Sequence, residues 1–458
     1  MRSFPPLCAS IALVANSWAA DFSTDIAPVL MSECLTCHNA EKAKGGYRVH
    51  NFAALLQPGK SKLAPVVPEK PEESELFKRL TTHDEDDRMP QDDDPLTPAQ
   101  IELFRRWIAD GAKLDRGEPQ SPLALLVPRA LHPNPPQSYR FPVPVLALSF
   151  ATDEKQLATA GYHEVIFWNL NGEIQHRVTN APQRIHSIAF DPSAPAEKQR
   201  FAIAGGKPGR AGEVSVYENG AFLTNLVLTA DEMLSVAFSP DGSLLAAGGA
   251  DNSIRIFHTK DWEPAATIQQ HADWVTSVAF NPANTKVISA SRDRTARIYE
   301  AESGELDTTY TEHGAAVLAA AFLSDDIAVS GGKEKSVHLW DTKEGKKQKD
   351  FGEASGEIYA IQPKGDSFFT ASADEKVRQY SIKDRKLLRT FSGNDDSVYS
   401  ITCNASGSRL AAGTYRGVVK IWNIQDGEPA GKFIASPLRE AKPVASVTNA
   451  PVTSPVPR

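Results

Sequence analysis

Residues 235–258 read SVAFSPDGSLLAAGGADNSIRIFH, and this stretch decides the fold of most of the chain. Apolar segments with the alternation of β-strands are separated there by turn residues such as Pro240-Asp241-Gly242. The same arrangement recurs through the sequence. A first apolar strand ends at Phe150, Phe190, Phe238, Phe280, Phe322, Gln362 and Cys403, and a later strand ends in an aromatic residue at Trp168, Tyr217, Phe257, Tyr299, Trp340, Tyr380 and Trp422.

The two kinds of strand keep the same period through seven copies. Successive first strands end 40, 48, 42, 42, 40 and 41 residues apart, and the second copy is lengthened around residues 194–199 and 205–212. Each unit offers four short β-segments, which cannot bury both faces of a sheet without neighbouring units. Residues 143–436 are therefore predicted to form an all-β domain of packed repeats.

These repeats resemble a WD-repeat β-propeller of seven blades. In that family a His, a Ser or Thr, a turn Asp and the strand-ending Trp brace each blade through hydrogen bonds. Residues that match this brace are Asp251, Asp293, Asp374, His271 and His313. The Asp position holds a different residue in blades one, two, five and seven, namely Tyr162, Ala211, Glu334 and Arg416. The resemblance implies a protein-binding propeller face, with incomplete braces in those four blades.

Composition narrows the class of protein. The chain has 458 residues and a formal net charge of −8, from 49 Lys and Arg against 57 Asp and Glu. It has no Lys/Arg-rich stripe, so nucleic acid is not an expected partner. Four cysteines are too few for a disulfide scaffold. The sequence contains neither a phosphate-binding loop nor a nucleophile elbow, and we predict no enzyme activity.

The N-terminus has the order of a signal peptide. An apolar run over residues 7–15 follows Arg2 and precedes small residues up to Ala20. This run is shorter than the roughly 20 residues that span a bilayer. Residues 1–20 are therefore predicted to be a signal peptide cleaved near Ala19 or Ala20, with a membrane anchor as the alternative. The mature protein would be periplasmic or otherwise exported, with no stable membrane span.

Three further regions follow from composition and pattern. Residues 21–114 mix helical periodicity with polar loops. Residues 115–142 hold seven prolines and no sustained period, which predicts an extended linker. Residues 437–458 are rich in Pro, Ala, Val and Ser and are predicted to form a disordered tail.

Residues 34–38 read Cys-Leu-Thr-Cys-His, the attachment pattern of c-type haem. On a helical turn, Cys34 and Cys37 can both reach the haem vinyl groups as thioethers, and His38 then presents its imidazole to the iron. A zinc site would need two more ligands, and a thioredoxin-like pair would need a βαβ unit. A short disulfide is a further alternative. The adjoining histidine and the predicted export favour haem c.

Met89 is the candidate for the second axial ligand of the iron. Of the two other methionines in the mature chain, Met31 lies on the attachment segment and Met233 lies in the repeats. Ligation by a thioether and an imidazole raises the reduction potential relative to two imidazoles, which suits electron transfer. The alternatives are His50 or His83 as the ligand, or a vacant position.

A helix is predicted to follow this site. Residues 97–100, Thr-Pro-Ala-Gln, form a capping box with Pro at the first helical position. Apolar residues including Phe104 and Trp107 then recur at helical spacing, and Gly111 ends the helix. We expect this apolar face to pack on the haem edge or on the N-terminal helix. Trp107 would then be a core residue, a residue that contacts the cofactor, or both.

Acidic residues surround Met89. Runs of acids occupy residues 84–87 and 92–94, and residues 21–114 together hold 17 acids against 12 bases. Carboxylates around the haem would attract a basic redox partner at low ionic strength. The alternative is a solvated loop that maintains solubility or binds Ca²⁺ weakly.

The whole segment resembles a planctomycete-type cytochrome c domain. The matching stretches cover nearly all of residues 21–114 and are CLTCH at 34–38, GGYRV at 45–49, ESEL at 73–76, RMP at 88–90 and WIADGA at 107–112. By this resemblance, Cys34 and Cys37 bind haem covalently while His38 and Met89 bind its iron. The predicted fold class is multidomain: a small all-α cytochrome c domain followed by an all-β, seven-bladed WD-repeat propeller.

These features together predict an exported c-type cytochrome that transfers one electron and uses its propeller as a docking platform for a protein partner. The alternatives are a subunit of a periplasmic oxidoreductase whose propeller channel binds substrate, and a haem-based sensor or scaffold. An iron with both axial positions filled handles electrons rather than substrates, which favours electron transfer.

Overall fold

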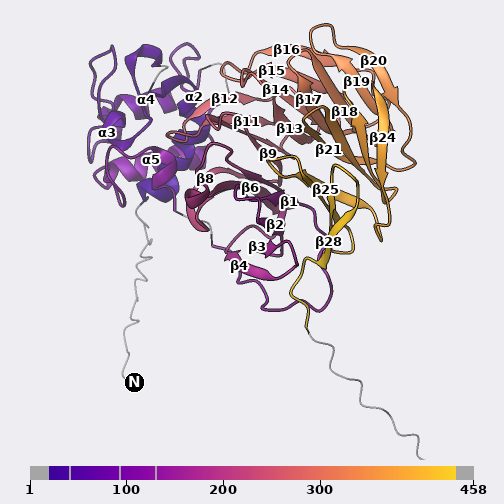
Figure 1. The fold of residues 1–458 in the computed structure, drawn as a ribbon. Coiled ribbons are helices and arrows are strands. Elements are labelled where there is room, and N and C mark those ends of the chain that lie inside the picture. The colour runs from indigo at the N-terminus through magenta and orange to yellow at the C-terminus, as the bar shows by residue number, and fades with distance from the viewer. Residues whose placement is uncertain (1–19, 41–42, 92–93, 129–130, 440–458) are drawn as a thin grey trace, which may run out of the picture.

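The computed structural model describes residues 20–40, 43–91, 94–128 and 131–439, and it shows a helical N-terminal domain beside a β-propeller (Figure 1). Residues 1–19 of the predicted signal peptide and residues 440–458 of the predicted tail lie outside the described residues. The helices before the propeller are η1 (Phe22–Ile26), α1 (Ala27–Val29), η2 (Leu30–Cys34), α2 (Leu35–His38), η3 (Lys44–Gly46), α3 (Phe52–Leu55), η4 (Pro71–Glu73), α4 (Glu75–Thr81), α5 (Pro98–Ala109) and α6 (Leu123–Leu126). None of the described helices combines the length and apolarity that crossing a membrane requires.

The described residues include seven four-stranded antiparallel sheets, which confirms the seven-bladed propeller. The first three blades are β1 (Leu148–Phe150), β2 (Gln156–Ala160), β3 (Glu164–Asn169), β4 (Ile174–Thr179); β5 (Arg184–Phe190), β6 (Arg200–Lys207), β7 (Ala211–Glu218), β8 (Ala221–Thr229); and β9 (Met233–Phe238), β10 (Leu244–Gly249), β11 (Ile254–His258), β12 (Pro264–Ile268). The helical turn η5 (Ala196–Lys198) lies in the lengthened second copy.

Blades four to seven repeat the same order of strands. They are β13 (Val275–Phe280), β14 (Lys286–Ser291), β15 (Ala296–Glu300), β16 (Leu306–Tyr310); β17 (Val317–Ser324), β18 (Ile327–Gly332), β19 (Val337–Asp341), β20 (Lys346–Phe351); β21 (Ile358–Lys364), β22 (Ser367–Ser372), β23 (Val377–Ser381), β24 (Lys386–Phe391); and β25 (Val398–Cys403), β26 (Arg409–Thr414), β27 (Val418–Asn423), β28 (Pro429–Ile434). The first strand of each blade contacts the first strands of both neighbouring blades. First strands therefore line the centre, and fourth strands form the rim.

The linker closes the ring of blades. Each blade is built from consecutive strands, so no strand is exchanged between blade one and blade seven. Instead, the amide of Tyr139 donates to the carbonyl of Pro437 at 2.7 Å, and the amide of Arg439 donates to the carbonyl of Tyr139 at 3.0 Å. Beyond them, the amide of Val145 donates to the carbonyl of Thr414 at 3.1 Å. Backbone pairing thus holds both ends of the propeller together.

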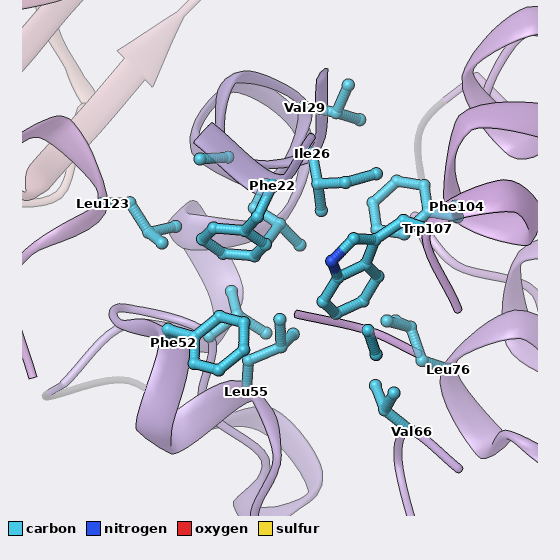
Figure 2. Close-up of a cluster of buried hydrophobic side chains, with 14 of the residues drawn as sticks. Phe22, Ile26, Val29, Phe52, Leu55, Val66, Leu76, Phe104, Trp107 and Leu123 are labelled. Atoms are coloured by element: carbon cyan, nitrogen blue, oxygen red, sulfur yellow. The ribbon is translucent and has the colours of Figure 1, made fainter. Parts of the chain in front are cut away.

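The core of the helical domain forms around α5 (Figure 2). The helix begins with the predicted capping box, in which the Thr97 hydroxyl accepts from the Gln100 amide and the Gln100 side chain accepts from the Thr97 amide. Its buried face includes Phe104 and Trp107, and the rings of Trp107 and Phe22 on η1 lie 5.5 Å apart. Of the two packing partners expected for this face, it contacts the N-terminal helical segment.

Blade five has a complete brace although Glu334 replaces the usual Asp. His313 bonds to the Glu334 carboxylate through Nδ1 and to the Ser330 hydroxyl through Nε2, at 2.7 Å for the second bond. The Trp340 indole N–H donates to the same hydroxyl at 3.0 Å. The predicted gap in this brace was wrong, because the extra methylene of glutamate still leaves the carboxylate within reach of the imidazole.

Replacing His313 by alanine is expected to lower the free energy of unfolding by about 1–3 kcal/mol, because the buried Ser330 and the half-buried Glu334 side chains lose a hydrogen-bond partner. Urea unfolding followed by far-UV circular dichroism measures the loss. His83→Ala, an exposed histidine in the helical domain, is the control and should unfold like the wild type. Equal stability of the two variants would show that the brace contributes nothing.

Candidate functional site

Cys34, Cys37 and His38 lie where the helical segment that starts at Phe22 ends, at the junction of η2 and α2. Residues three apart on a helix lie on the same side of it, so the two cysteines can act together. Both thiols are free rather than joined in a disulfide. Burial raises the pKa of the Cys34 thiol to about 12. Two unbonded sulfur atoms therefore stand beside an imidazole.

The orientation of His38 is fixed from the following loop. Its Nδ1 lies 3.1 Å from the carbonyl oxygen of Tyr47, which can only accept a hydrogen bond, so Nδ1 carries the proton. Tyr47 is itself anchored, because its hydroxyl donates to the carbonyl of Leu55 on α3 at 2.8 Å. Burial lowers the pKa of His38, which favours the neutral ring. The imidazole therefore keeps the lone pair of Nε2 for a metal.

Met89 is positioned by the loop between α4 and α5. Its amide donates to the carbonyl of Arg79 at 2.9 Å. The Arg79 guanidinium bonds to Glu75 one turn earlier on α4, at 2.9 Å, and to the carboxylate of Asp87. These contacts tie the loop to the end of α4 and hold Met89 against the helical domain, where it packs on the core.

The four predicted site residues meet at one cavity of about 830 Å³, which Cys34, Cys37, His38 and Met89 all line. Met31 lines it too, from the turn before Cys34. The alternative ligands His50 and His83 are absent from the cavity lining among the described residues, and Trp107 is absent as well. The structure therefore brings together the predicted ligand set and places Trp107 in the core.

The acidic residues lie mainly outside this cavity. Residues 84–87 are exposed, and the carboxylate of Asp87 is paired with Arg79. Asp94 lines the cavity together with Glu33, whereas Asp92 and Asp93 lie outside the described residues. The described acids thus form an exposed loop near the cavity rather than a ring around it.

The far wall of the cavity comes from the propeller, which sequence analysis did not anticipate. Lining residues from the outer strands β8, β11 and β12 are Asn225, Leu226, Val227, Leu228, Arg255, Phe257, Pro264 and Thr267. Figure 1 shows the helical domain against this side of the propeller, beside β8, β11 and β12. The cavity therefore lies between the two domains, at the rim of blades two and three.

Direct contacts hold the two domains together around the cavity. The Thr224 hydroxyl of β8 donates to the carbonyl of Ala124 on α6, and Ala124 is buried in the propeller core cluster. The amide of Ala40, just after α2, donates to the carboxylate of Glu263 at 3.3 Å. Met31 packs on the hydrophobic cores of both domains. The propeller wall of the cavity is thus part of a packed interface between the two domains.

The donor set fits a c-type haem. Two free thiols on one helical face, an imidazole with its Nδ1 already bonded and a thioether all line one cavity. Its volume lies within the roughly 300–1,000 Å³ of small-molecule and cofactor sites. A haem held there would be attached through Cys34 and Cys37 and would face His38 and Met89 with its iron.

Comparison with known families agrees with both resemblances found in the sequence. Residues 34–93 match the family described as planctomycete cytochrome C, and this segment contains all four site residues. Four segments match the family described as WD domain, G-beta repeat: residues 225–258, 262–300, 304–341 and 385–423. The first match suggests haem binding, and the second is typical of a non-catalytic scaffold for protein–protein interaction.

Parts of the chain are similar to parts of curated proteins. A stretch of 66 residues is 35% identical to the periodic tryptophan protein 2 homolog of Schizosaccharomyces pombe, covering 14% of this chain and 8% of that protein. THO complex subunit 6 of Arabidopsis thaliana is 26% identical over 69 residues, or 15% and 19% of the two chains. Apoptotic protease-activating factor 1 of Rattus norvegicus is 27% identical over 108 residues, or 23% and 9%. The chain spans less than a fifth of each of these proteins.

Proposed function

We propose that the chain is an exported c-type cytochrome that transfers single electrons through a covalently bound haem c, with its propeller as a platform for a protein partner. The observation that carries the proposal is the cavity at which Cys34, Cys37, His38 and Met89 meet. The match of residues 34–93 to a cytochrome family supports it independently.

Each site residue has a separate role in this proposal. Cys34 and Cys37 attach the cofactor through thioether bonds, while the Tyr47 carbonyl holds Nδ1 of His38 and thereby directs Nε2 to the iron. A haem bound in this way supplies a one-electron iron couple. Met89 would hold the iron as its second protein ligand, and a thioether together with an imidazole would give that couple a higher potential than two imidazoles. No position is then left for a substrate, which favours electron transfer over catalysis.

Location and partners follow from the same chemistry. Haem c is attached outside the cytoplasm, so covalent haem and the predicted signal peptide both support a periplasmic or otherwise exported protein. The exposed acids of residues 84–87 would favour a redox partner with a basic surface, through long-range attraction at low ionic strength. The propeller supports docking of a protein partner, as scaffolds of this family do.

Replacing Met89 by alanine is expected to turn a low-spin haem spectrum into a high-spin one, because the iron loses its second strong ligand. The measurement is an optical spectrum of oxidised and dithionite-reduced protein produced with a c-type haem maturation system. Met31→Ala is the matched control, since Met31 lines the same cavity but lies on the attachment segment, and it should stay low-spin.

Two results would contradict this assignment in different ways. A wild-type protein that is already high-spin would mean that Met89 is not a ligand, and the sensor or oxidoreductase alternatives would then gain support. A protein without covalent haem would remove the cytochrome function altogether. A low-spin wild type that becomes high-spin in Met31→Ala but not in Met89→Ala would assign the ligand to Met31.

The oxidoreductase alternative requires contact between the cofactor and the propeller channel. The cavity borders β8, β11 and β12, whereas the strands that line the centre are the first strands of the blades, such as β5 and β9. A substrate in the channel would therefore be separated from the cofactor by the width of a blade. This separation supports an electron-transfer role for the cavity.

A further inference from the structure

The wall that the propeller contributes to the cavity includes an exposed apolar side chain and a buried polar one, both on β8. Leu228 on β8 is a large apolar side chain that is 53% exposed, and it lines the cavity. Asn225, on the same strand, also lines the cavity and is only 2% exposed. The side-chain amide of Asn225 pairs with the Ser215 hydroxyl at 2.7 Å.

Apolar surface inside a cavity suits contact with an apolar ligand. A flat apolar ring that carries carboxylates at its edge, as haem does, could cover Leu228 and leave its carboxylates free to pair with a cation that lines the cavity.

Among the described residues, Arg255 is the cationic side chain that the propeller wall contributes to the cavity, whereas Lys44, Glu33 and Asp94 line it from the helical domain. Arg255 lies on β11, and its Nη1 contacts the carboxylate of Asp251 at 2.8 Å. A guanidinium has five N–H donors. Two of those of Arg255 are on Nη1, and the three on Nε and Nη2 can donate to a carboxylate in the cavity.

We propose that the outer strands of blades two and three form the second half of the haem site, in which Arg255 donates hydrogen bonds to a haem carboxylate and Leu228 covers the ring. The inference rests on the proposed haem binding and deepens it. The propeller then has a second role besides docking: it shields the cofactor and adjusts its reduction potential through charge and hydrogen bonds.

Charge substitutions at Leu228 test this placement with little risk to the fold, since the side chain is already half exposed. Leu228→Lys is expected to raise the midpoint potential, because a positive charge favours the reduced iron, and Leu228→Asp is expected to lower it. Each should change the ratio of oxidised to reduced protein at a fixed potential by about tenfold, which is about 59 mV for one electron. Leu388→Asp is the control, because Leu388 is similarly exposed, at 48%, on an outer strand of blade six.

A further variant tests the donor. Arg255→Gln is expected to lower the midpoint potential, with about a tenfold change in the ratio of oxidised to reduced protein, because a haem carboxylate loses its cationic partner. Arg297→Gln is the matched control: Arg297 is on β15, the equivalent strand of blade four, beside Asp293 as Arg255 is beside Asp251. Arg297 does not line the cavity, and its removal should leave the potential unchanged.

The outcomes separate this inference from the proposed function. Covalent haem with a low-spin spectrum, together with opposite shifts for Leu228→Lys and Leu228→Asp, supports the shared site. Covalent haem with a potential that no variant moves more than the two controls would overturn it and leave the cytochrome function intact. Absence of covalent haem from the wild type would instead overturn the function on which the inference rests.

Discussion

Protein in which Cys34 and Cys37 are both replaced by serine is expected to carry no haem after denaturing electrophoresis, whereas the wild type gives a stained band. The thioether bonds are the only covalent links proposed, and a serine hydroxyl cannot form them. The proposed ligation by His38 and Met89 would depend on the fold and would be lost in detergent. The measurement is a haem stain of the gel, compared with a protein stain of the same lane.

Cys403→Ser is the matched control for this double substitution. Cys403 ends β25 in blade seven of the propeller and does not line the cavity. The control should therefore stain like the wild type. Each single substitution, Cys34→Ser or Cys37→Ser, should retain one link and give a weaker band. A stained double variant would disprove covalent attachment at this pair.

The propeller could be predicted from the sequence because each blade is formed by consecutive residues. Strand ends such as Phe238 on β9 and Phe257 on β11 are 18 or 19 residues apart in every copy except the lengthened second one, because the strands of a blade are neighbours both in sequence and in the sheet. The attachment segment is equally local, since residues 34–38 lie at one helix junction. Spacing along the chain was therefore sufficient to predict the blades, and to predict that the two cysteines and the histidine of residues 34–38 lie together.

Contacts between the domains could not be predicted from spacing along the chain. The bond from Thr224 to the Ala124 carbonyl joins residues 100 apart, and the bond from Ala40 to Glu263 joins residues 223 apart. No shared period relates these positions, so the propeller wall of the cavity left no signal in the sequence. The brace of blade five was predicted to be incomplete because Glu334 differs from the family's aspartate. Whether its carboxylate reaches His313 depends on the fold, which the residue type alone does not show.

Trp107→Ala is expected to be the most destabilising substitution in the helical domain, by about 3–5 kcal/mol. Trp107 is 2% exposed, and its ring lies 5.5 Å from that of Phe22 and 6.3 Å from that of Phe52 (Figure 2). Truncation would leave a large cavity between η1, α3 and α5. It would also remove the hydrogen bond from the indole N–H to the carbonyl of Lys113, at 3.0 Å.

Hydrogen exchange resolved by segment measures this effect without requiring the two domains to unfold together. Because about 1.4 kcal/mol corresponds to a factor of ten, protected amides in residues 22–109 should exchange at least about a hundredfold faster in Trp107→Ala, while those of the propeller keep their rates. Trp274→Ala is the control: this half-buried propeller tryptophan stacks under Arg292 at 4.3 Å, and its loss should leave the helical domain unchanged. Unchanged exchange in Trp107→Ala would mean that α5 is held by other contacts and that its apolar face is not the centre of the core.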